Sequence, residues 1–403
     1  MQEYPDIICV AFPTWEGNYA KSTVQLISQL AKRHRVLYVD YEYTWKDVLM
    51  GSLGKKEAPW KRITGINKRL RKLSTGYGSD VFVLTPPPVF PVNWVNSSRL
   101  YRKGIHFNTY LIRESILHAS HIVGLNAPVV LNAFNPFYGL FSLGKLGESK
   151  NIYYCYDEIS AAQWAGKHGP SLEKDFIRQV DAVITSSGAL QKNKKSLNEN
   201  CHLIPNGVDY QAFNQYCKDP DPHEKKEKVV GYVGSIDDRL DYTLLRQLIG
   251  QYPDYQFRFI GRIVEPELIQ PLQAFQNVEF TGPVNYTKLP EKVAEFDVCL
   301  IPFVRNTFTQ SIYPLKINEY LAAGKPVVMS RFSDHLDEFQ HVSSICETPE
   351  AFCQAVANEI RQDTAQKVKA RCKIAQENSW ENRAKQFSDI VRQVTYENQL
   401  LHQ

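Results

Sequence analysis

The chain has 403 residues, of which 43% are hydrophobic and 22% are charged. This length exceeds what one ordinary hydrophobic core organises, so two domains of about 200 residues each are expected. The net charge of +4 is too small to indicate nucleic-acid binding on its own, and no nucleic-acid partner is predicted. The eight cysteines form no CxxC pair and several lie in apolar runs, which indicates reduced thiols in a cytoplasmic protein.

The amino terminus shows no signal peptide, because Met1–Asp6 has no basic start and leads directly into an apolar run. The longest apolar stretch, 127–144, is interrupted by Asn132, Asn135 and Pro136, so it is not predicted to span a membrane. We therefore expect a cytoplasmic protein. Peripheral attachment to the inner face of the cell membrane remains open.

The first half of the chain alternates between strand-like and helix-like segments. Apolar runs of strand length lie at 6–12, 35–40, 81–85, 127–133 and 151–156. Such runs are typical of parallel strands buried on both faces. The loop after the first run contains Gly17 but no GxGxxG motif, and this glycine either lets the backbone approach a phosphate or serves a turn. The pattern predicts a doubly wound α/β domain.

Residues 46–72 are rich in lysine and arginine, with Asp47 and Glu57 as the acidic residues. Apolar side chains among them follow helical spacing, at Ile63, Ile66, Leu70 and Leu73. The pattern predicts a basic amphipathic helix. Such a helix either lies on an anionic membrane surface or packs on its own domain with a solvated basic face.

Asp157 and Glu158 directly follow the strand predicted at 151–156. In open α/β sheets, ligands bind where the strands end, so Asp157 is a candidate to contact an acceptor or a reacting sugar. The alternative is that the acidic pair caps the next helix.

The chain becomes polar and proline-containing at 216–228, which predicts a linker. We therefore assign 1–210 to a first domain and 226–380 to a second. Asp219 and Asp221 match the DxD metal-binding motif. Because no apolar strand precedes them, we interpret them as part of a surface loop. No metal-ligand set is evident.

The second domain opens with a predicted strand at 228–235 that ends in Gly234 and Ser235. Small residues at this point let a diphosphate come close to backbone N–H groups. The next predicted strand ends at Arg262, which can pair with a phosphate. Further apolar runs lie at 277–284, 297–303 and 326–329. This alternation predicts a second doubly wound sheet.

A short helix is predicted within 311–326, with Pro314 in its first turn and Gly324 at its end. Lys316 lies near the helix start, where the helix dipole disfavours a cation by several tenths of a kcal/mol unless an anion such as a diphosphate is bound. Glu319 shares that face about 5 Å further along, where a carboxylate can accept hydrogen bonds from ribose hydroxyls. The alternative is an ordinary surface pair.

Three segments resemble motifs of the GT-B glycosyltransferases of the group 1 superfamily. Glu319 and the small-residue run 322–328 resemble its donor-binding signature, Asn206–Asp209 its domain-junction marker, and Asn378–Trp380 the marker before its last helix. The Pro-x-Lys before the single glutamate is similar to teichuronic-acid-type polysaccharide transferases.

The chain also departs from the family pattern. Ser311 stands where the signature has its first glutamate, and Asp157 stands where a histidine is frequent. Retaining members carry an arginine and a lysine after the first strand of the second domain, whereas residues 235–241 offer only Arg239.

The resemblance implies two Rossmann-like domains facing across a cleft, with a C-terminal helix at 381–403 crossing back to the first domain. It implies a retaining, metal-independent, hexosyltransferase-like enzyme that needs no cofactor. Such an enzyme moves a sugar from a nucleotide-diphosphate sugar, such as a UDP-sugar, to a glycan or lipid-linked acceptor in cell-surface polysaccharide biosynthesis. Because these acceptors lie at the membrane, the resemblance favours the membrane interpretation of 46–72.

Site residues follow from the same resemblance. The donor diphosphate would be held by backbone groups at Tyr313, Pro314 and Leu315, with Lys316 and Arg239 offsetting its charge. Val284 would lie in the loop that contacts the nucleobase.

Two other functions are compatible with the sequence. One is a sugar-nucleotide epimerase of the same architecture. The other is a non-catalytic nucleotide-sugar-binding protein, which Ser311 and the missing arginine and lysine pair suggest.

Overall fold

The structure is a computed structural model that describes residues 4–17, 21–161, 165, 168–220, 227–310 and 312–400. Backbone contacts divide the chain into two compact units. The first unit runs to Pro205 and includes the chain from Arg383 onward, and the second contains Asn206–Asn382. Ser311 and Asp221, which entered the sequence argument, lie outside the described residues.

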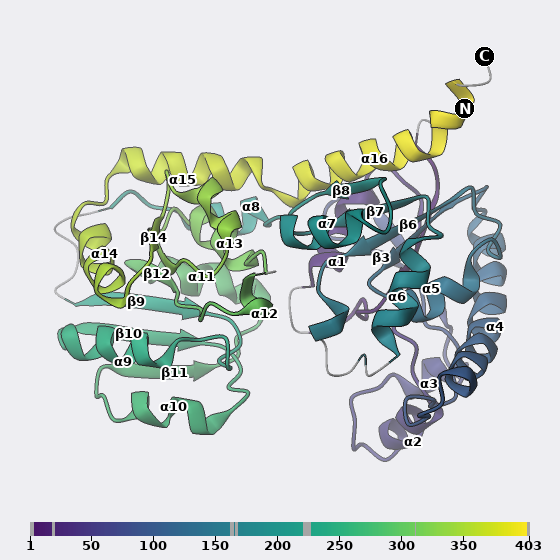
Figure 1. Ribbon diagram of the computed structural model, residues 1–403, viewed down its shortest axis with the longest axis horizontal. Helices are drawn as coiled ribbons and strands as arrows, with labels where there is room; N and C mark the ends of the chain where they lie inside the picture. The colour runs from purple at the N-terminus through teal and green to yellow at the C-terminus, as the bar shows by residue number, and fades with distance from the viewer. Residues whose placement is uncertain are drawn as a thin grey trace. The chain divides into compact units, whose positions relative to one another are not determined.

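The first unit is built on an eight-stranded sheet with the order β3-β4-β2-β1-β5-β6-β7-β8 (Figure 1). Its strands are β1 (Ile7–Ala11), β2 (Val36–Val39), β3 (Leu70–Ser74), β4 (Asp80–Leu84), β5 (Val129–Ala133), β6 (Lys150–Cys155), β7 (Ala182–Thr185) and β8 (Cys201–Leu203). All neighbouring strands pair in parallel except β3, which is antiparallel to β4. Every residue of β1 is buried, as its continuous apolar run predicts.

The crossover segments of this unit are mostly helical. The helices are α1 (Ser22–Leu30), α2 (Trp45–Ser52), α3 (Trp60–Ile63), α4 (Ser98–Val123), α5 (Pro136–Ser142), the short η1 (Ile159–Ala161), α6 (Gly169–Ile177) and α7 (Gly188–Lys195). The C-terminal helix α16 (Trp380–Leu400) also packs here. Its Phe387 ring lies 5.3 Å from the ring of Tyr154, and its Ser388 hydroxyl lies 2.9 Å from His34 Nε2. The last helix thus packs on the first unit, as the resemblance implied.

The predicted amphipathic helix through 63–73 is wrong. Helix α3 ends at Ile63, Gly65 follows with φ +84°, and Leu70 and Leu73 belong to strand β3. The left-handed glycine ends the helix, and the backbone groups of 70–74 are satisfied by pairing with β4 instead. The helical spacing of these apolar residues was therefore incidental.

The second unit is built on a six-stranded parallel sheet with the order β11-β10-β9-β12-β13-β14. Its strands are β9 (Lys228–Val233), β10 (Tyr255–Ile260), β11 (Val278–Gly282), β12 (Val298–Ile301), β13 (Val327–Ser330) and β14 (Ser344–Cys346). Its helices are α8 (Tyr210–Asn214), α9 (Tyr242–Gln251), α10 (Pro266–Gln273), η3 (Tyr286–Lys288), α11 (Leu289–Ala294), α12 (Thr307–Gln310), α13 (Leu315–Ala322), η4 (Asp334–Phe339), α14 (Pro349–Arg361) and α15 (Ala365–Glu377). Helices lie on both faces of this sheet (Figure 1).

Helix α13 has the start and end that the sequence predicts, shifted by one position at its start. Pro314 is the residue before the first helical position, and Gly324 follows the C-terminal cap with φ +72°. Lys316 therefore lies in the first turn and Glu319 one turn further along.

Among the described helices, none combines enough length with enough apolar residues to span a bilayer.

Candidate functional site

A cavity of about 410 Å³ opens where strands β9 and β10 end in the second unit. Five of the residues singled out from the sequence lie in its wall: Gly234, Ser235, Arg262, Val284 and Glu319. This volume falls within the usual range of small-molecule sites. The carboxyl ends of parallel strands are also where α/β folds bind ligands.

The backbone at the cavity requires two glycines. Gly234 has φ +139° and Gly261 has φ +155°, a region that L-residues rarely adopt. A Cβ atom on Gly261 would lie 1.9 Å from the Gly234 carbonyl oxygen, and one on Gly234 would lie 2.6 Å from Lys316 Nζ. The two strand ends can approach each other and Lys316 only because neither carries a side chain.

Lys316 occupies a pocket between two aromatic rings. Its Nζ donates a hydrogen bond to the Tyr232 hydroxyl at 2.8 Å and lies 4.1 Å from the centre of that ring. The Phe303 ring is 4.7 Å away. Burial, and then the charge of Arg239, hold the pKa of Lys316 well below its ordinary value, while Glu319 opposes this shift. An anion bound beside Lys316 would restore its charged form.

Glu319 lies in the cavity wall and is half-buried. Burial raises its pKa to about 7, although the Lys316 charge and a hydrogen bond with Tyr286 act in the opposite direction. Lys316 and Glu319 are thus not a solvated surface pair. They form a partly desolvated pair at the edge of a cavity.

Arg239 lies near this cluster but is already paired with a carboxylate. Its Nε and Nη2 donate to the two carboxylate oxygens of Asp237 at 2.8 and 2.6 Å. Its guanidinium also lies 5.7 Å from the Phe303 ring centre. Its predicted role toward a diphosphate stays a prediction, and Asp237 would compete with the ligand for it.

The residues before α13 contribute backbone and packing. The Tyr313 hydroxyl accepts a hydrogen bond from Asn318 at 3.0 Å, and the Tyr313 ring packs 6.0 Å from that of Phe339. Pro314 and Leu315 form the helix start. The predicted backbone contacts of these residues with a diphosphate stay a prediction.

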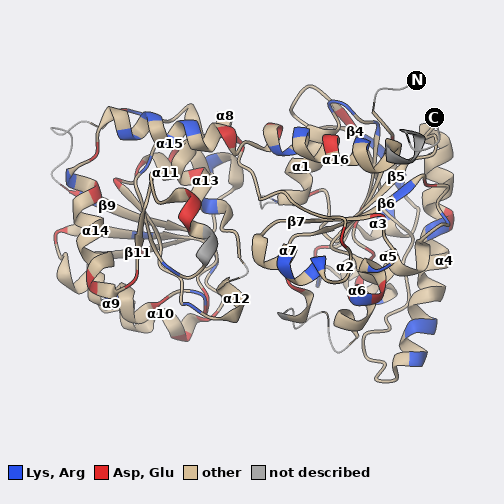
Figure 2. Ribbon diagram, turned by 45° about the horizontal axis from the view of Figure 1, so that its top comes forward, with Lys and Arg blue, Asp and Glu red and all other residues tan. Residues whose placement is uncertain are grey.

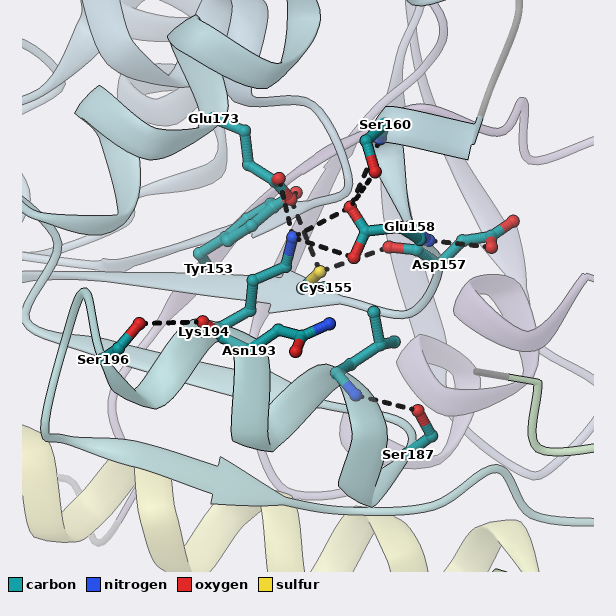
Figure 3. Close-up of polar contacts among 11 residues, drawn as sticks. Tyr153, Cys155, Asp157, Glu158, Ser160, Glu173, Ser187, Asn193, Lys194 and Ser196 are labelled. Carbon is teal, nitrogen blue, oxygen red and sulfur yellow. Dashed lines mark hydrogen bonds and ion pairs between the residues drawn. The ribbon is translucent and has the colours of Figure 1, made fainter. Parts of the chain in front are cut away.

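The other two predicted residues belong to the first unit. Asp157 is exposed, and its Oδ1 accepts a hydrogen bond from the Glu158 N–H at 2.8 Å (Figure 3). Gly17 is exposed with φ +145°, in a loop where Lys21 Nζ donates to the Thr14 carbonyl at 2.6 Å. Their predicted roles stay predictions.

Glu158 points inward. It makes the capping contacts that were the alternative role predicted for the acidic pair Asp157 and Glu158. Its Oε1 accepts from the Ser160 N–H at 3.2 Å and from the Ser160 hydroxyl at 2.9 Å. It also pairs with Lys194, which in turn pairs with Glu173 at 2.8 Å (Figure 3). The network fixes the turn that carries Asp157.

A buried polar cluster at the carboxyl ends of β2 and β5 was not predicted from the sequence. Asn135 donates to Glu42 at 2.7 Å, and Asn132 exchanges hydrogen bonds with the Asn135 backbone. Burial raises the pKa of Glu42 to about 8. Phe134 lies between the two asparagines with φ +58°, which is strained for an aromatic residue. Asparagine inside an apolar strand was the available signal.

Two tyrosines of the site were also not predicted: Tyr232, which contacts Lys316, and Tyr286, which contacts Glu319. Tyr232 lies in an apolar strand, where a core residue is expected, so its contact with Lys316 could not be predicted from its surroundings in the chain. Tyr286 begins η3, directly after the loop assigned to the nucleobase side of the site, and this position was the available signal.

Comparison with known proteins shows what the unit that contains this cavity is similar to. Residues 227–362 match the model of the family described as "Glycosyl transferases group 1". The second unit therefore contains a segment similar to the group 1 glycosyl transferases. Every residue in the cavity wall lies inside the matched segment, so the cavity belongs to the part of the chain that resembles this family.

A curated relative matches part of the chain. It is the "Putative teichuronic acid biosynthesis glycosyltransferase TuaH" of Bacillus subtilis (strain 168), 32% identical over 167 residues. The match covers 39% of this chain and 42% of the relative, so it spans less than half of either protein.

Solved structures match nearly the whole chain and so include both units. Sucrose-phosphate synthase from Thermosynechococcus elongatus is 15% identical, with a TM-score of 0.66 and coverage of 97% of this chain and 99% of that chain. HepE of Anabaena, solved in complex with UDP and glucose, is 15% identical, with a TM-score of 0.63 and coverage of 97% and 100%. At such identities the likeness establishes the fold, and the predicted α/β GT-B class is confirmed.

Proposed function

We propose that this protein is a glycosyltransferase that moves a sugar from a nucleotide-diphosphate sugar to a glycan or lipid-linked acceptor in cell-surface polysaccharide biosynthesis. One observation carries the proposal. Glu319 lies in the wall of a glycine-lined cavity inside the matched segment, and Lys316 lies one turn before it, next to Gly234 of that wall. The partial match to a putative teichuronic acid glycosyltransferase supports the acceptor class.

In the proposed complex the donor diphosphate lies against the backbone of Gly234 and Ser235 and the first turn of α13. The positive end of the helix and its N–H groups suit an anion there. Arg262, in the cavity wall, adds a cation. Glu319 then accepts hydrogen bonds from the ribose hydroxyls, and the base lies toward Val284.

The proposed reaction breaks the bond between the anomeric carbon and the donor diphosphate. The acceptor hydroxyl oxygen forms the new bond to that carbon, and its proton leaves with the departing nucleotide or to solvent. Negative charge develops on the leaving phosphate, which Lys316 and Arg262 stabilise electrostatically. We propose that the reaction retains the anomeric configuration and needs neither a metal nor another cofactor. The UDP and glucose bound to HepE support a UDP-sugar as the first donor to test.

A donor panel tests the function. The full chain would be screened by thermal shift against UDP-, GDP-, ADP- and dTDP-sugars, and then assayed for nucleotide release with and without lipid-linked acceptors. Glu319→Ala should lose donor-induced stabilisation, and Glu279→Ala, at a half-exposed pair with Arg258, is the matched control. Acceptor-dependent release of nucleotide supports a transferase, conversion of the donor to an epimeric nucleotide sugar without an acceptor supports an epimerase, and binding without turnover supports the non-catalytic alternative.

Mechanistic details need separate measurements. NMR of the product would show whether the anomeric configuration is retained. Activity that survives chelation of divalent cations would support the metal-independent proposal, and loss that Mg²⁺ or Mn²⁺ restores would overturn it.

We also propose a membrane-facing surface, composed of α2, residues 89–94 and the first half of α4, and we call it the α2–α4 surface. Large apolar side chains are exposed along it: Trp45, Leu49, Leu53, Phe90, Trp94, Leu100, Phe107 and Tyr110. Contacts join its parts, because the Trp45 N–H donates to the Val89 carbonyl at 3.0 Å and the rings of Phe90 and Phe107 lie 5.9 Å apart.

The charge of this surface suits anionic lipid. Exposed lysine and arginine side chains flank the apolar ones, at Lys46, Lys55, Lys61, Arg99 and Lys103. The basic positions of α4 are visible in Figure 2. Aromatic side chains favour the bilayer interface, and each basic residue near anionic lipid contributes about 1 kcal/mol to binding.

Flotation with anionic vesicles tests the α2–α4 surface. Leu49→Glu with Phe107→Glu should abolish flotation, and equal flotation with neutral vesicles would contradict the charge argument.

A further inference from the structure

Two cysteines that lie 155 residues apart in the chain meet in the second unit, with their sulfur atoms 3.5 Å from each other. Cys217 follows helix α8, and Cys372 lies on α15. Both are half-buried, whereas the other six cysteines of the chain are buried. Cys217 and Cys372 are therefore the two thiols of the chain that are partly accessible to solvent.

The pair lies against the last turn of α13. Cys372 Sγ accepts a hydrogen bond from Asn214 Nδ2 at 3.4 Å and lies 3.9 Å from the Ala322 carbonyl oxygen. A Cβ atom on Gly324 would lie 2.5 Å from Cys217 Sγ. Helices α8, α13 and α15 therefore enclose the two sulfurs on three sides.

The surroundings give the two thiols different acidities. The hydrogen bond from Cys372 lowers the pKa of Cys217 to about 7, against the effect of burial, and Lys325 and Arg371 add to the lowering while Asp219 opposes it. The same hydrogen bond and burial raise the pKa of Cys372. A thiol with a pKa near the ambient pH is the best attacking group in thiol–disulfide exchange.

We propose that Cys217 and Cys372 are a modification site at which a small-molecule disulfide of the glutathione class reversibly oxidises the chain to an intrachain disulfide. The Cys217 thiolate, after losing its proton to solvent, attacks one sulfur of the small disulfide and releases one thiolate. Cys372, after losing its own proton, then attacks Cys217 Sγ and displaces the second thiolate. Two protein thiols are oxidised to one disulfide, and one small disulfide is reduced to two thiols.

The geometry requires only a local closure. The sulfurs must move from 3.5 Å to about 2 Å apart. The bond would tie the chain after α8 to α15 across the last turn of α13, the helix that carries Lys316 and Glu319. This inference does not depend on the proposed function, because the thiol contact exists whatever the cavity binds.

Thiol mapping on the full chain tests the site. The protein would be incubated with oxidised glutathione near neutral pH, its remaining thiols alkylated, and its peptides mapped by mass spectrometry. The wild-type chain should lose two thiols and yield one linked pair of peptides, containing Cys217 and Cys372. Cys372→Ser should stop at a single glutathione adduct on Cys217, and Cys217→Ser should leave Cys372 unmodified. Cys201→Ser, which removes a buried thiol of the first unit, should behave as wild type.

A second measurement applies even if a variant folds poorly. The alkylation rate of Cys217 in the wild-type chain should rise through a midpoint near pH 7, and the midpoint should move upward in Cys372→Ser. Two results would overturn the proposal: a disulfide or adduct pattern that excludes Cys217, or an alkylation midpoint near pH 8.5 in the wild-type chain, which is that of an ordinary thiol.

Discussion

The amino group of Lys316 donates a hydrogen bond to the hydroxyl of Tyr232 at 2.8 Å and lies 4.1 Å from the centre of the same ring. A tyrosine on the first strand of the second unit thus positions the amino group of a lysine in the first turn of α13. The Tyr232 hydroxyl donates its own proton to the Ser235 carbonyl at 2.9 Å, which fixes its direction. The lysine is consequently held in place before any ligand binds.

Replacing Lys316 should impair chemistry more than binding. Lys316→Ala removes a cation placed where the leaving phosphate gains charge, and loss of one such group lowers kcat by about 10²- to 10³-fold. Tyr232→Phe keeps the ring and removes one hydrogen bond, so a loss of about fivefold is expected, equivalent to about 1 kcal/mol. Steady-state kinetics with the donor identified by the panel would measure both. Lys228→Ala, whose amino group pairs with Asp297, is the control, and an equal loss there would argue against a specific role for Lys316.

Donor binding should weaken as the pH falls through the pKa of Glu319, which is about 7. The ionised carboxylate accepts two hydroxyl hydrogen bonds, whereas the protonated form must donate its own proton and accepts less well. The donor Kd should therefore rise between pH 8 and pH 6. Glu319→Gln should bind more weakly at pH 8 and lose most of this dependence, which calorimetry would show. A wild-type Kd that stays constant over this range would contradict the ribose contact.

Gly261→Ala should disrupt the cavity, because its Cβ would lie 1.9 Å from the Gly234 carbonyl oxygen. Backbone atoms cannot move aside as a flexible side chain does, so a loss of more than about 2 kcal/mol in unfolding free energy is expected. Gly282→Ala is the matched control, since Gly282 also has a positive φ, +74°, but nothing within 4 Å of the added carbon. It should cost only about 1 kcal/mol. Urea denaturation of both variants measures the difference, and equal costs would exclude the close approach as the cause.

The fold followed from the sequence where local rules decide it. The buried run of β1 and the proline and glycine that bound α13 act through neighbouring residues, and these elements were predicted. The structure of 63–73 was not predicted. Residues 70–74 form a strand because they pair with β4, and this pairing partner does not enter the local spacing from which the helix was predicted.

The site, like the fold, could be predicted where neighbouring residues determine it. Lys316 and Glu319 stood out through their spacing on one short helix. The Lys316 contact with Tyr232 joins positions 84 residues apart, and nothing in either segment indicates the other. The ion pair between Arg239 and Asp237 depends on the backbone conformation of one loop, which could not be predicted from the sequence.

The free energy of unfolding should depend on pH through Glu42, whose pKa burial raises to about 8. A carboxyl group with a folded-state pKa above its unfolded value, about 4.3, binds protons more tightly when folded, so its contribution to stability is present at low pH and is lost as the pH rises toward 8. Glu42→Gln cannot ionise but keeps an oxygen that can accept from Asn135. Between pH 5 and pH 8, the free energy of unfolding of the variant should therefore rise by a few kcal/mol relative to that of the wild type, at about 1.4 kcal/mol for each pH unit. Urea denaturation at pH 5, 6.5 and 8 tests this, and a constant difference between the two proteins would contradict it.

The last prediction concerns Lys194, which is buried between Glu173 and Glu158 (Figure 3). Lys194→Met removes the cation and leaves the buried Glu173 carboxylate without its ion pair, a change that costs about 3–5 kcal/mol. Adding Glu173→Gln should recover part of this loss, because a neutral amide needs no counter-ion and its oxygen can still accept from the Tyr153 hydroxyl, which now donates at 2.9 Å.

Lys195→Met is the control, because Lys195 is exposed on the same helix, and its unfolding free energy should change by less than about 0.5 kcal/mol. Because Glu158 also loses its partner in Lys194→Met, the turn that carries Asp157 should loosen, which hydrogen exchange of the Ser160 amide would report. If the double variant were no more stable than Lys194→Met, the loss would come from packing rather than from an uncompensated charge.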